Sequence, residues 1–297
     1  ILVVGAGPVG AVTALAFARQ GLDVTVLEAE ASYDERPRAA TIHASTLEMM
    51  RSLAIVDAVI ARGLVSRRFQ HWDRVSGELV AEFDFGCLAG ETDFPYAVQC
   101  ESHKLVQIAL AALAGHANAR VLRHHAVVEV RDQGGEVRAV CETPDGHVEI
   151  AGDYLVGTDG ARSVVRKSMG VAFDGYTFPE RFVGLTTPFD FEARYGYSNR
   201  NYFADPERWV MLFKVAGNDM RGLWRVISPA TGEEPDEAVL AEDAIQARVQ
   251  HFFPKETPYE IQYRGLYKFH QRVAGGFRVG RAFLAGDAAH VNNPAGG

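Results

Sequence analysis

Ile1-Leu-Val-Val-Gly5-Ala-Gly7-Pro8-Val-Gly10 is the stretch that decides the fold of this chain. Its four apolar residues predict a buried strand, and the segment 9–20 predicts a helix after a tight turn. We expect Gly5 to form the turn, Gly7 to let backbone amides approach a pyrophosphate, and Gly10 to let the helix pack on the strand. The pattern therefore predicts a β-turn-α unit that binds a dinucleotide.

A second strand and a carboxylate follow at the spacing that this unit requires. The alternating segment 23–27 ends at Glu28, which lies 18 residues beyond Gly10. In dinucleotide-binding folds, a carboxylate roughly 20 residues after the glycines holds the adenosine ribose. By its length alone, the uncharged stretch 1–18 also suits a membrane span or a signal-peptide core. Its glycines and proline favour the β-turn-α unit instead.

The composition limits the partners and the compartment. The chain has 297 residues, of which 47% are hydrophobic, and a formal net charge of −8 with no basic run. These values predict two domains and argue against nucleic acid or an anionic membrane as a partner. Cys87, Cys100 and Cys141 are odd in number and form no CxxC motif, which predicts reduced thiols, a cytoplasmic protein and no metal site.

Two further motifs lie far along the chain. The segment 153–166 predicts a short strand, an Asp159-Gly160 turn and the start of a helix. The segment 283–290 predicts another strand, which runs into a loop at Gly286-Asp287. We expect parallel strands to deliver such loops to the crevice where the first motif binds its ligand.

Helices and antiparallel strands are predicted between these motifs. Turn residues at 133–135 and 144–146 divide the segment 121–150 into a β-meander. The other expected elements are a helix that begins at a capping box of Ser45 and Glu48, paired strands at 69–72 and 79–85, a helix at 102–114, strands within 182–227 with a hairpin turn at 205–207, a helix at 236–252 and a strand at 259–270.

The three motifs resemble, in order and spacing, those of the class A flavoprotein monooxygenases. These are FAD-dependent aromatic hydroxylases that include the 4-hydroxybenzoate, phenol and 3-hydroxyphenylpropionate hydroxylases. The resemblance covers essentially the whole chain. The cofactor-binding residues that it implies are Gly5, Gly7, Pro8, Gly10, Glu28, Arg36, Arg38, Gln99, Asp159, Gly286, Asp287 and Pro294.

The resemblance also implies roles for some of these side chains. Asp287 would bond a ribityl hydroxyl of FAD, and Asp159 would hold either Arg162 or a flavin-side loop. Arg38, and with it Arg36, would lie near the FAD pyrophosphate, whose oxygens match the planar fork of a guanidinium group. Gln99 would contact the flavin.

The activity that the resemblance implies is hydroxylation of a phenol-like aromatic substrate. NAD(P)H would reduce FAD, and O₂ would provide the oxygen atom through a flavin hydroperoxide, while the protein binds, orients and excludes water. Two alternatives are a flavoprotein that reduces or epoxidises a lipid or prenyl substrate, and a non-catalytic flavin-binding module. The sequence also leaves open whether the protein forms a homodimer.

The substrate pocket is expected against the strands of 182–227. His43 is the candidate catalytic residue, because a neutral imidazole can accept a phenol proton near physiological pH. Arg221 and Arg225 suit either a substrate carboxylate or solvent. The aromatic and sulfur-containing candidates for the pocket wall are Tyr202, Trp209, Met211, Phe213 and Trp224.

The expected architecture is an α/β fold with two domains. A discontinuous, Rossmann-like FAD-binding domain with a β-meander would comprise 1–68, 97–175 and 271–297. A substrate-binding α+β domain of 69–96 and 176–270 would carry a mostly antiparallel sheet. Ile1 lies directly on the first strand and 292–297 stops in a glycine loop, so we expect the chain to be part of a longer protein.

Overall fold

The computed structural model describes residues 1–36, 38–206, 208–230 and 234–293. Among them, 1–36, 102–177 and 270–293 form one compact unit, the first unit, and 38–101 and 178–269 form the second unit. The first unit thus contains all three motifs, except for Pro294, which lies outside the described residues.

Apart from residues 176–177 and 270 at the boundaries, the two units differ from the predicted domains at two segments. The sequence-based boundaries place 38–68 and 97–101 with the dinucleotide-binding motifs, whereas both segments fall within the second unit. They are held together there because β3 (Thr41–Ile42) and β4 (Leu64–Ser66) pair with β7 (Ala97–Gln99) in a small sheet of their own.

A six-stranded sheet forms the centre of the first unit. In spatial order it comprises β18 (Arg278–Val279), β19 (Ala282–Leu284), β12 (Leu155–Gly157), β1 (Leu2–Val4), β2 (Val24–Leu27) and β8 (Ala119–Leu122). All neighbouring strands from β19 to β8 run parallel. The strands predicted at 1–4, 23–27 and within 153–166 are therefore neighbours in one parallel sheet.

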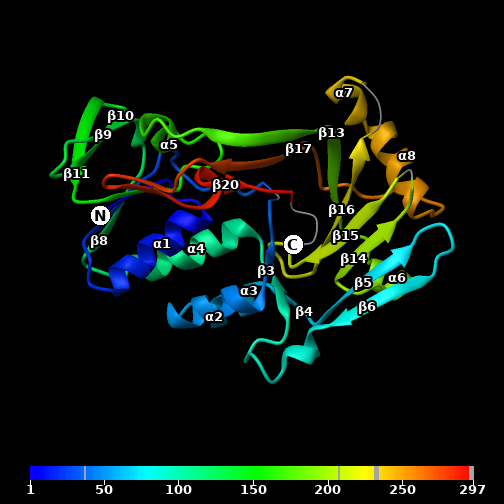
Figure 1. Cartoon of the computed structure of the whole chain (residues 1–297). Helices are drawn as coiled ribbons and strands as arrows, with labels where there is room; N and C mark the ends of the chain where they lie inside the picture. The colour runs from blue at the N-terminus through cyan, green and yellow to red at the C-terminus, as the bar shows by residue number, and fades with distance from the viewer. Residues whose placement is uncertain (37, 207, 231–233, 294–297) are drawn as a thin grey trace. The chain divides into compact units, whose positions relative to one another are not determined.

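Helices and a second sheet pack against this parallel sheet. α1 (Pro8–Arg19) and α4 (Ser102–Leu113) lie side by side (Figure 1) and match the helices predicted at 9–20 and 102–114. Because side chains alternate along a strand, Leu2 and Val4 point away from Val3, and they join a buried cluster with Val137 and Leu155.

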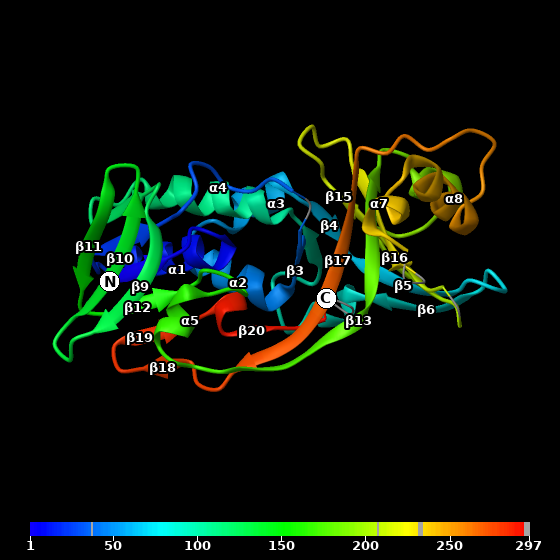
Figure 2. The ribbon, with the colours of Figure 1, turned by 90° about the horizontal axis from the view of Figure 1, so that it is seen from above.

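The predicted β-meander is confirmed for three strands. β9 (Ala126–Asp132), β10 (Val137–Thr143) and β11 (Gly146–Gly152) form an antiparallel sheet, visible beside the strands of the first unit in Figure 2. The prediction was wrong at its start, because Val121 lies in β8 and pairs with Val26 of the parallel sheet. His124, with a φ of 57°, lies between β8 and β9.

The predicted capping box is wrong. α2 (Ala44–Ser52) begins one residue before Ser45, since the extended backbone that leaves β3 continues to His43, which is the N-cap residue. The Glu48 carboxylate instead accepts a hydrogen bond from Thr92 Oγ1 at 2.7 Å and pairs with Arg51. Leu47 and Met50 are buried, as the helical pattern predicts. A second helix, α3 (Val56–Arg62), follows.

A larger sheet of mostly antiparallel strands dominates the second unit, as predicted. Its only parallel pair among the described strands is β14 with β5. The strands of this sheet that contribute residues to the second unit are, in spatial order, β17 (Tyr263–Ala274), β13 (Phe173–Thr187), β16 (Leu223–Ala230), β15 (Val210–Val215), β14 (Arg200–Ala204), β5 (Arg68–Asp73) and β6 (Leu79–Asp84). The turn predicted at 205–207 joins β14 to β15, but residue 207 lies outside the described part of the chain.

One face of this sheet packs on a helical layer. Leu185, Leu212 and Val226 from the strands meet Ile245 and Val249 of α8 (Glu242–Phe252) in a buried cluster, which α6 (Phe191–Tyr195) completes through Phe191. The helix predicted at 236–252 is in fact two, because extended backbone at Ala241 separates α8 from α7 (Asp236–Val239). The strand predicted at 259–270 begins later, at Tyr263.

None of the helices in the described residues is long and apolar enough to cross a bilayer. Within those residues, no three His, Cys, Asp or Glu side chains gather as metal ligands would. No disulfide joins Cys87, Cys100 and Cys141, all of which the structure describes.

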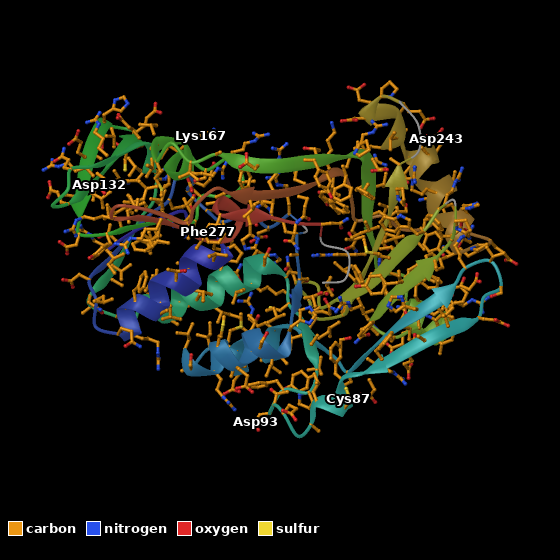
Figure 3. All side chains as sticks on the ribbon, viewed as in Figure 1. Cys87, Asp93, Asp132, Lys167, Asp243 and Phe277 are labelled. Carbon is orange, nitrogen blue, oxygen red and sulfur yellow. The ribbon has the colours of Figure 1, made fainter. Side chains whose placement is uncertain are left out.

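The three thiols should differ sharply in reactivity. Burial raises the pKa of Cys141 to about 11, so this thiol stays protonated at pH 8, and Cys100 is buried as well. Cys87, labelled in Figure 3, lies in the short helix η1 (Phe85–Leu88) and is exposed. We expect a chromogenic disulfide reagent at pH 8 to modify one thiol quickly in the folded protein and all three in denaturant.

The variant Cys87→Ser should lose the fast phase, whereas Cys141→Ser should keep it. Rapid modification of two or three thiols in the folded protein would contradict this assignment.

Candidate functional site

Three loops meet at one edge of the parallel sheet. Because β1, β12 and β19 are parallel neighbours, their carboxyl ends lie together. A Cβ atom on Gly5 would lie 2.9 Å from the carbonyl oxygen of Thr158, and one on Gly286 would lie 2.8 Å from Cγ2 of Val9. The three predicted motifs therefore converge within the first unit, as the sequence analysis expects.

The glycines of the first loop have different surroundings. Gly5 has a φ of +94°, which favours glycine, and a Cβ on Gly10 would lie only 1.9 Å from the Gly5 carbonyl oxygen. A Cβ on Gly7, by contrast, would meet nothing within 4 Å. Gly7 is the N-cap of α1 and Pro8 its first residue, so the amides of the helix start open onto this space. This cradle fits the pyrophosphate of a dinucleotide.

The Glu28 carboxylate lies against the same turn. Its Oε2 accepts a hydrogen bond from the Ala6 amide at 2.6 Å, and its Oε1 accepts one from the Glu30 amide at 2.9 Å. Each carboxylate oxygen has a second lone pair, which leaves acceptor capacity for a ribose hydroxyl. The turn and the second strand thus hold Glu28 at the position that a ribose ligand requires.

Asp159 organises its own loop. Its Oδ1 accepts a hydrogen bond from Ser163 Oγ at 2.6 Å, and its Oδ2 accepts those of Val164 and Val165 at 2.7 and 3.1 Å. These amides belong to the start of α5 (Val164–Ser168), while Arg162 is exposed. Asp159 was expected to hold either Arg162 or a loop, and in the structure its carboxylate holds the loop that leads into α5.

Arg166 and Thr158 connect the loops, and sequence reasoning gave neither of them a role. Arg166 is buried, and its Nη1 and Nη2 donate to the carbonyl oxygens of Ala288 and Ala161 at 2.9 and 2.8 Å. Its guanidinium also lies 3.8 Å from the centre of the Phe173 ring. Thr158 Oγ1 lies 2.8 Å from the Val4 carbonyl oxygen, to which it donates. The sequence signals that could have indicated these connecting roles were an arginine and a threonine close to a glycine-containing turn.

The third loop carries Asp287 in the short helix η2 (Gly286–Ala288). Asp287 is exposed, while Ala288 beside it is buried and held through its carbonyl by Arg166. The carboxylate can therefore reach a ligand while its backbone stays fixed.

Arg36 differs from these residues. Its side chain is 71% exposed and forms a bidentate pair with Asp34, with Nη2 2.7 Å from Oδ2. A role at the pyrophosphate stays a prediction for Arg36.

The second unit supplies the remaining candidates for the cofactor. Gln99 lies at the end of β7 and is 1% exposed. Its Oε1 accepts a hydrogen bond from Thr41 Oγ1 at 3.0 Å, but its buried Nε2 has no hydrogen-bond partner among the described residues. Such a buried donor is usually completed by a ligand or a water, which fits a flavin oxygen or nitrogen. Arg38, also in this unit, accepts a hydrogen bond from Arg225 through its carbonyl oxygen.

His43, the catalytic candidate, lies at the start of α2 in the second unit. Burial, and after it the positive charge of Arg200, lower the pKa of His43 below its ordinary value of 6.5. The imidazole is therefore neutral at pH 7 and able to accept a proton.

The candidates for the pocket wall divide between the two faces of the large sheet. Tyr202 pairs with Met211 across β14 and β15, and Trp209 contacts Phe182 with ring centres 5.5 Å apart. Trp224 lies on the opposite face, 1% exposed in the helical-layer core, because side chains alternate along β16. Its predicted place in the wall is therefore at odds with the structure, whereas Phe213 pairs with Arg225 on the face of Met211.

A parallel sheet that brings a glycine turn, an Asp-Gly loop and a Gly-Asp loop to one edge defines a dinucleotide-binding flavoprotein. The chain belongs to the family described as FAD binding domain, whose model matches residues 1–297. This match confirms FAD as the cofactor, and together with the relatives that follow it confirms the resemblance to flavoprotein aromatic monooxygenases.

Individual relatives support the same family. The chain is 33% identical to para-nitrophenol 4-monooxygenase of Pseudomonas sp. (strain WBC-3), over all of this chain and 73% of the relative. It is 34% identical to 6-hydroxy-3-succinoylpyridine 3-monooxygenase HspB of Pseudomonas putida (strain DSM 28022 / S16), over all of this chain and 74% of that protein.

Solved structures agree. The crystal structure of p-nitrophenol 4-monooxygenase PnpA from Pseudomonas putida DLL-E4 superposes with a TM-score of 0.91 at 32% identity, covering 99% of this chain and 73% of that one. Aklavinone-11 hydroxylase, solved with FAD and aklavinone, superposes with a TM-score of 0.83 at 27% identity, covering 99% of this chain and 58% of that one.

Substitution of Gly7 should separate cofactor binding from folding. A φ of −66° and open space around its Cβ position make Gly7→Ala compatible with the fold, but the methyl group would occupy the space for the pyrophosphate. We expect the FAD dissociation constant to rise at least about tenfold, and the melting temperature of the apoprotein to change by less than about 4 °C.

Gly135→Ala is the matched control, since its Cβ also meets nothing within 4 Å but lies in the β9–β10 turn. Unchanged FAD affinity in Gly7→Ala, measured by flavin fluorescence titration, would contradict the cradle.

Proposed function

We propose that the protein hydroxylates a phenol-like aromatic substrate, using FAD, NAD(P)H and O₂. The observation that carries the proposal is the convergence of the three loops around the open side of Gly7. The names of relatives support the substrate class, because para-nitrophenol and pentachlorophenol monooxygenases both act on hydroxylated rings.

The proposed binding of FAD divides among named residues. Gly7 and the amides at the start of α1 receive the pyrophosphate, and Glu28 accepts from the ribose. Asp287 accepts from a ribityl hydroxyl, while Arg166 fixes the backbone next to it. Gln99 donates through Nε2 to the flavin. When bound, FAD supplies the redox chemistry that links the nicotinamide, O₂ and the aromatic ring.

The proposed substrate site uses the face of the large sheet that turns away from the helical layer. Tyr202 and Phe213, both partly exposed, offer an aromatic surface there, next to the buried Met211. His43 accepts the phenol proton, which raises the electron density of the ring and prepares it for attack by an electrophilic oxygen. Both features lie in the second unit.

Three further proposals concern the setting of the reaction. NAD(P)H is the reductant and binds transiently, since the chain carries a single glycine fingerprint of the dinucleotide type. The protein works in the cytoplasm, where its three cysteines stay reduced. A homodimer is the proposed assembly.

A visible absorption spectrum of the purified protein, after addition of FAD and removal of the excess, is the first test. We expect bound-flavin bands in this spectrum. In a kinetic assay of the same protein, we expect p-nitrophenol or another phenol to accelerate NAD(P)H oxidation at least about tenfold, with formation of a hydroxylated product. Retained flavin without substrate-stimulated oxidation would contradict the hydroxylase and favour a non-catalytic flavin-binding module.

If no flavin is retained, the same spectrum on a chain extended past Gly297, toward the length of the relatives, separates two causes. Flavin bands there would support the proposal, and a second blank would contradict it.

His43→Gln tests the proposed base. We expect kcat for hydroxylation to fall by about ten- to a hundredfold, with a smaller change in KM, because the amide cannot accept the phenol proton. Since the pKa of His43 is lowered, wild-type activity should persist at pH 6.5 and decline only below it, as the imidazole becomes protonated. His147→Gln, on exposed β11, is the control. An unchanged rate and acid limb in His43→Gln would exclude the role.

A further inference from the structure

Two arginines and a phenylalanine form one row across the large sheet of the second unit. Arg200 of β14 pairs with Phe213 of β15, and Phe213 pairs with Arg225 of β16. Directly paired residues in adjacent strands project from the same face, here the face opposite the helical-layer core. Figure 1 shows β14, β15 and β16 side by side. At about 4.8 Å per strand spacing, the two arginine backbones lie roughly 10 Å apart, with Phe213 between them.

The Arg225 guanidinium group has one edge that donates a hydrogen bond and one edge that lacks a hydrogen-bond partner among the described residues. Its Nη1 donates to the Arg38 carbonyl oxygen. Its Nε is buried and has no hydrogen-bond partner among the described residues, although the residue as a whole is partly exposed. Nε shares an edge with Nη2, and this edge donates two parallel hydrogen bonds to planar groups with two oxygens. A buried donor without a partner is costly, and a ligand that completes it gains affinity.

The charges around this edge favour an electron-rich ligand. Burial lowers the pKa of Arg225, and the neighbouring Glu101 carboxylate partly offsets that shift. An arginine stays protonated under such conditions. Glu101 Oε1 also accepts a hydrogen bond from the Gly217 amide at 2.8 Å. With Arg200 and Arg225 both cationic and His43 neutral, these four groups carry a net positive charge.

An apolar floor lies next to the arginine row on the same face. Tyr202, Met211 and Ile227 are paired across three strands, two residues along from Arg200, Phe213 and Arg225. Tyr202 and Ile227 are partly exposed, whereas Met211 between them is buried. A substrate ring on this floor would have a guanidinium edge beside one of its substituents. The same floor presents apolar and aromatic side chains to the faces of the ring.

We infer that Arg225 is a specificity-determining residue that anchors a planar two-oxygen substituent, a carboxylate or a nitro group, on the aromatic substrate. The inference rests on the proposed function for its substrate class, but it concerns ligand selection and can be tested without turnover. For Arg221 and Arg225 the sequence left open either a substrate carboxylate or solvent, and the inference assigns the substrate to Arg225. The Arg221 side chain is 87% exposed and lies 3.5 Å from the Asp219 carboxylate, so it faces solvent.

The test compares ligands that differ only in this substituent. Dissociation constants of the full chain with FAD, without NAD(P)H, are measured by calorimetry for 4-hydroxybenzoate against 4-hydroxybenzamide, and for 4-nitrophenol against 4-methylphenol. We expect the wild type to prefer the two-oxygen member of at least one pair by about tenfold or more. The pair that shows the preference identifies the substituent as a carboxylate or a nitro group.

Three variants assign that preference to a side chain. Arg225→Met should abolish it, and Arg221→Met, the matched control, should keep it. Arg225→Lys should keep only part of it, because an ammonium group cannot donate two parallel bonds from one edge. A partial preference in Arg225→Lys would show that the variants still bind ligand. An unchanged melting temperature would show that the loss in Arg225→Met is not caused by misfolding.

Two results would overturn the inference: no preference in either pair for the wild type, or a preference that survives in Arg225→Met. The proposed function is judged separately by substrate-stimulated NAD(P)H oxidation. Absence of the ligand preference with normal substrate-stimulated NAD(P)H oxidation would therefore contradict only the role of Arg225. The ligand preference without substrate-stimulated oxidation would contradict only the proposed hydroxylase activity.

Discussion

The close approach of α1 to the turn before it is the constraint on which the first unit depends. The Gly5 carbonyl oxygen occupies the place that a side chain at residue 10 would need, and Thr158, directly after the neighbouring strand β12, fills the space beside it. The sheet can bring its three loops together only with this packing, because any larger residue would push the helix from β1. The open side of Gly7 is a product of the same geometry.

Much of this unit could be predicted from the sequence, because backbone requirements leave a direct mark on residue type. Gly5 needs a positive φ, Gly10 needs the absence of a side chain, and Glu28 must directly follow the second strand. The assignment of Ser45 as a helix cap failed for the opposite reason. Several residues can cap a helix, and the backbone conformation of His43, which the sequence does not reveal, decided where α2 begins.

The second unit was harder to predict, because its function depends on which face of a sheet a residue occupies. Trp224 and Arg225 are neighbours in sequence and have opposite fates, one in the helical-layer core and the other beside Phe213. Alternation separates the two faces, but only the position of α8 identifies the buried one. Likewise, the buried donor of Gln99 and the connecting role of Arg166 depend on tertiary contacts.

The order in which the strands of the first unit occur along the chain has a consequence for biosynthesis. β1 leaves the ribosome first, yet β19, which pairs with β12 and carries Gly286-Asp287 at its end, is among the last segments made. Both stretches of the second unit are synthesised in between. A nascent chain can therefore complete the second unit before the first. The first unit stays incomplete until translation is nearly over, and until then its sheet has an unpaired edge that is prone to aggregation.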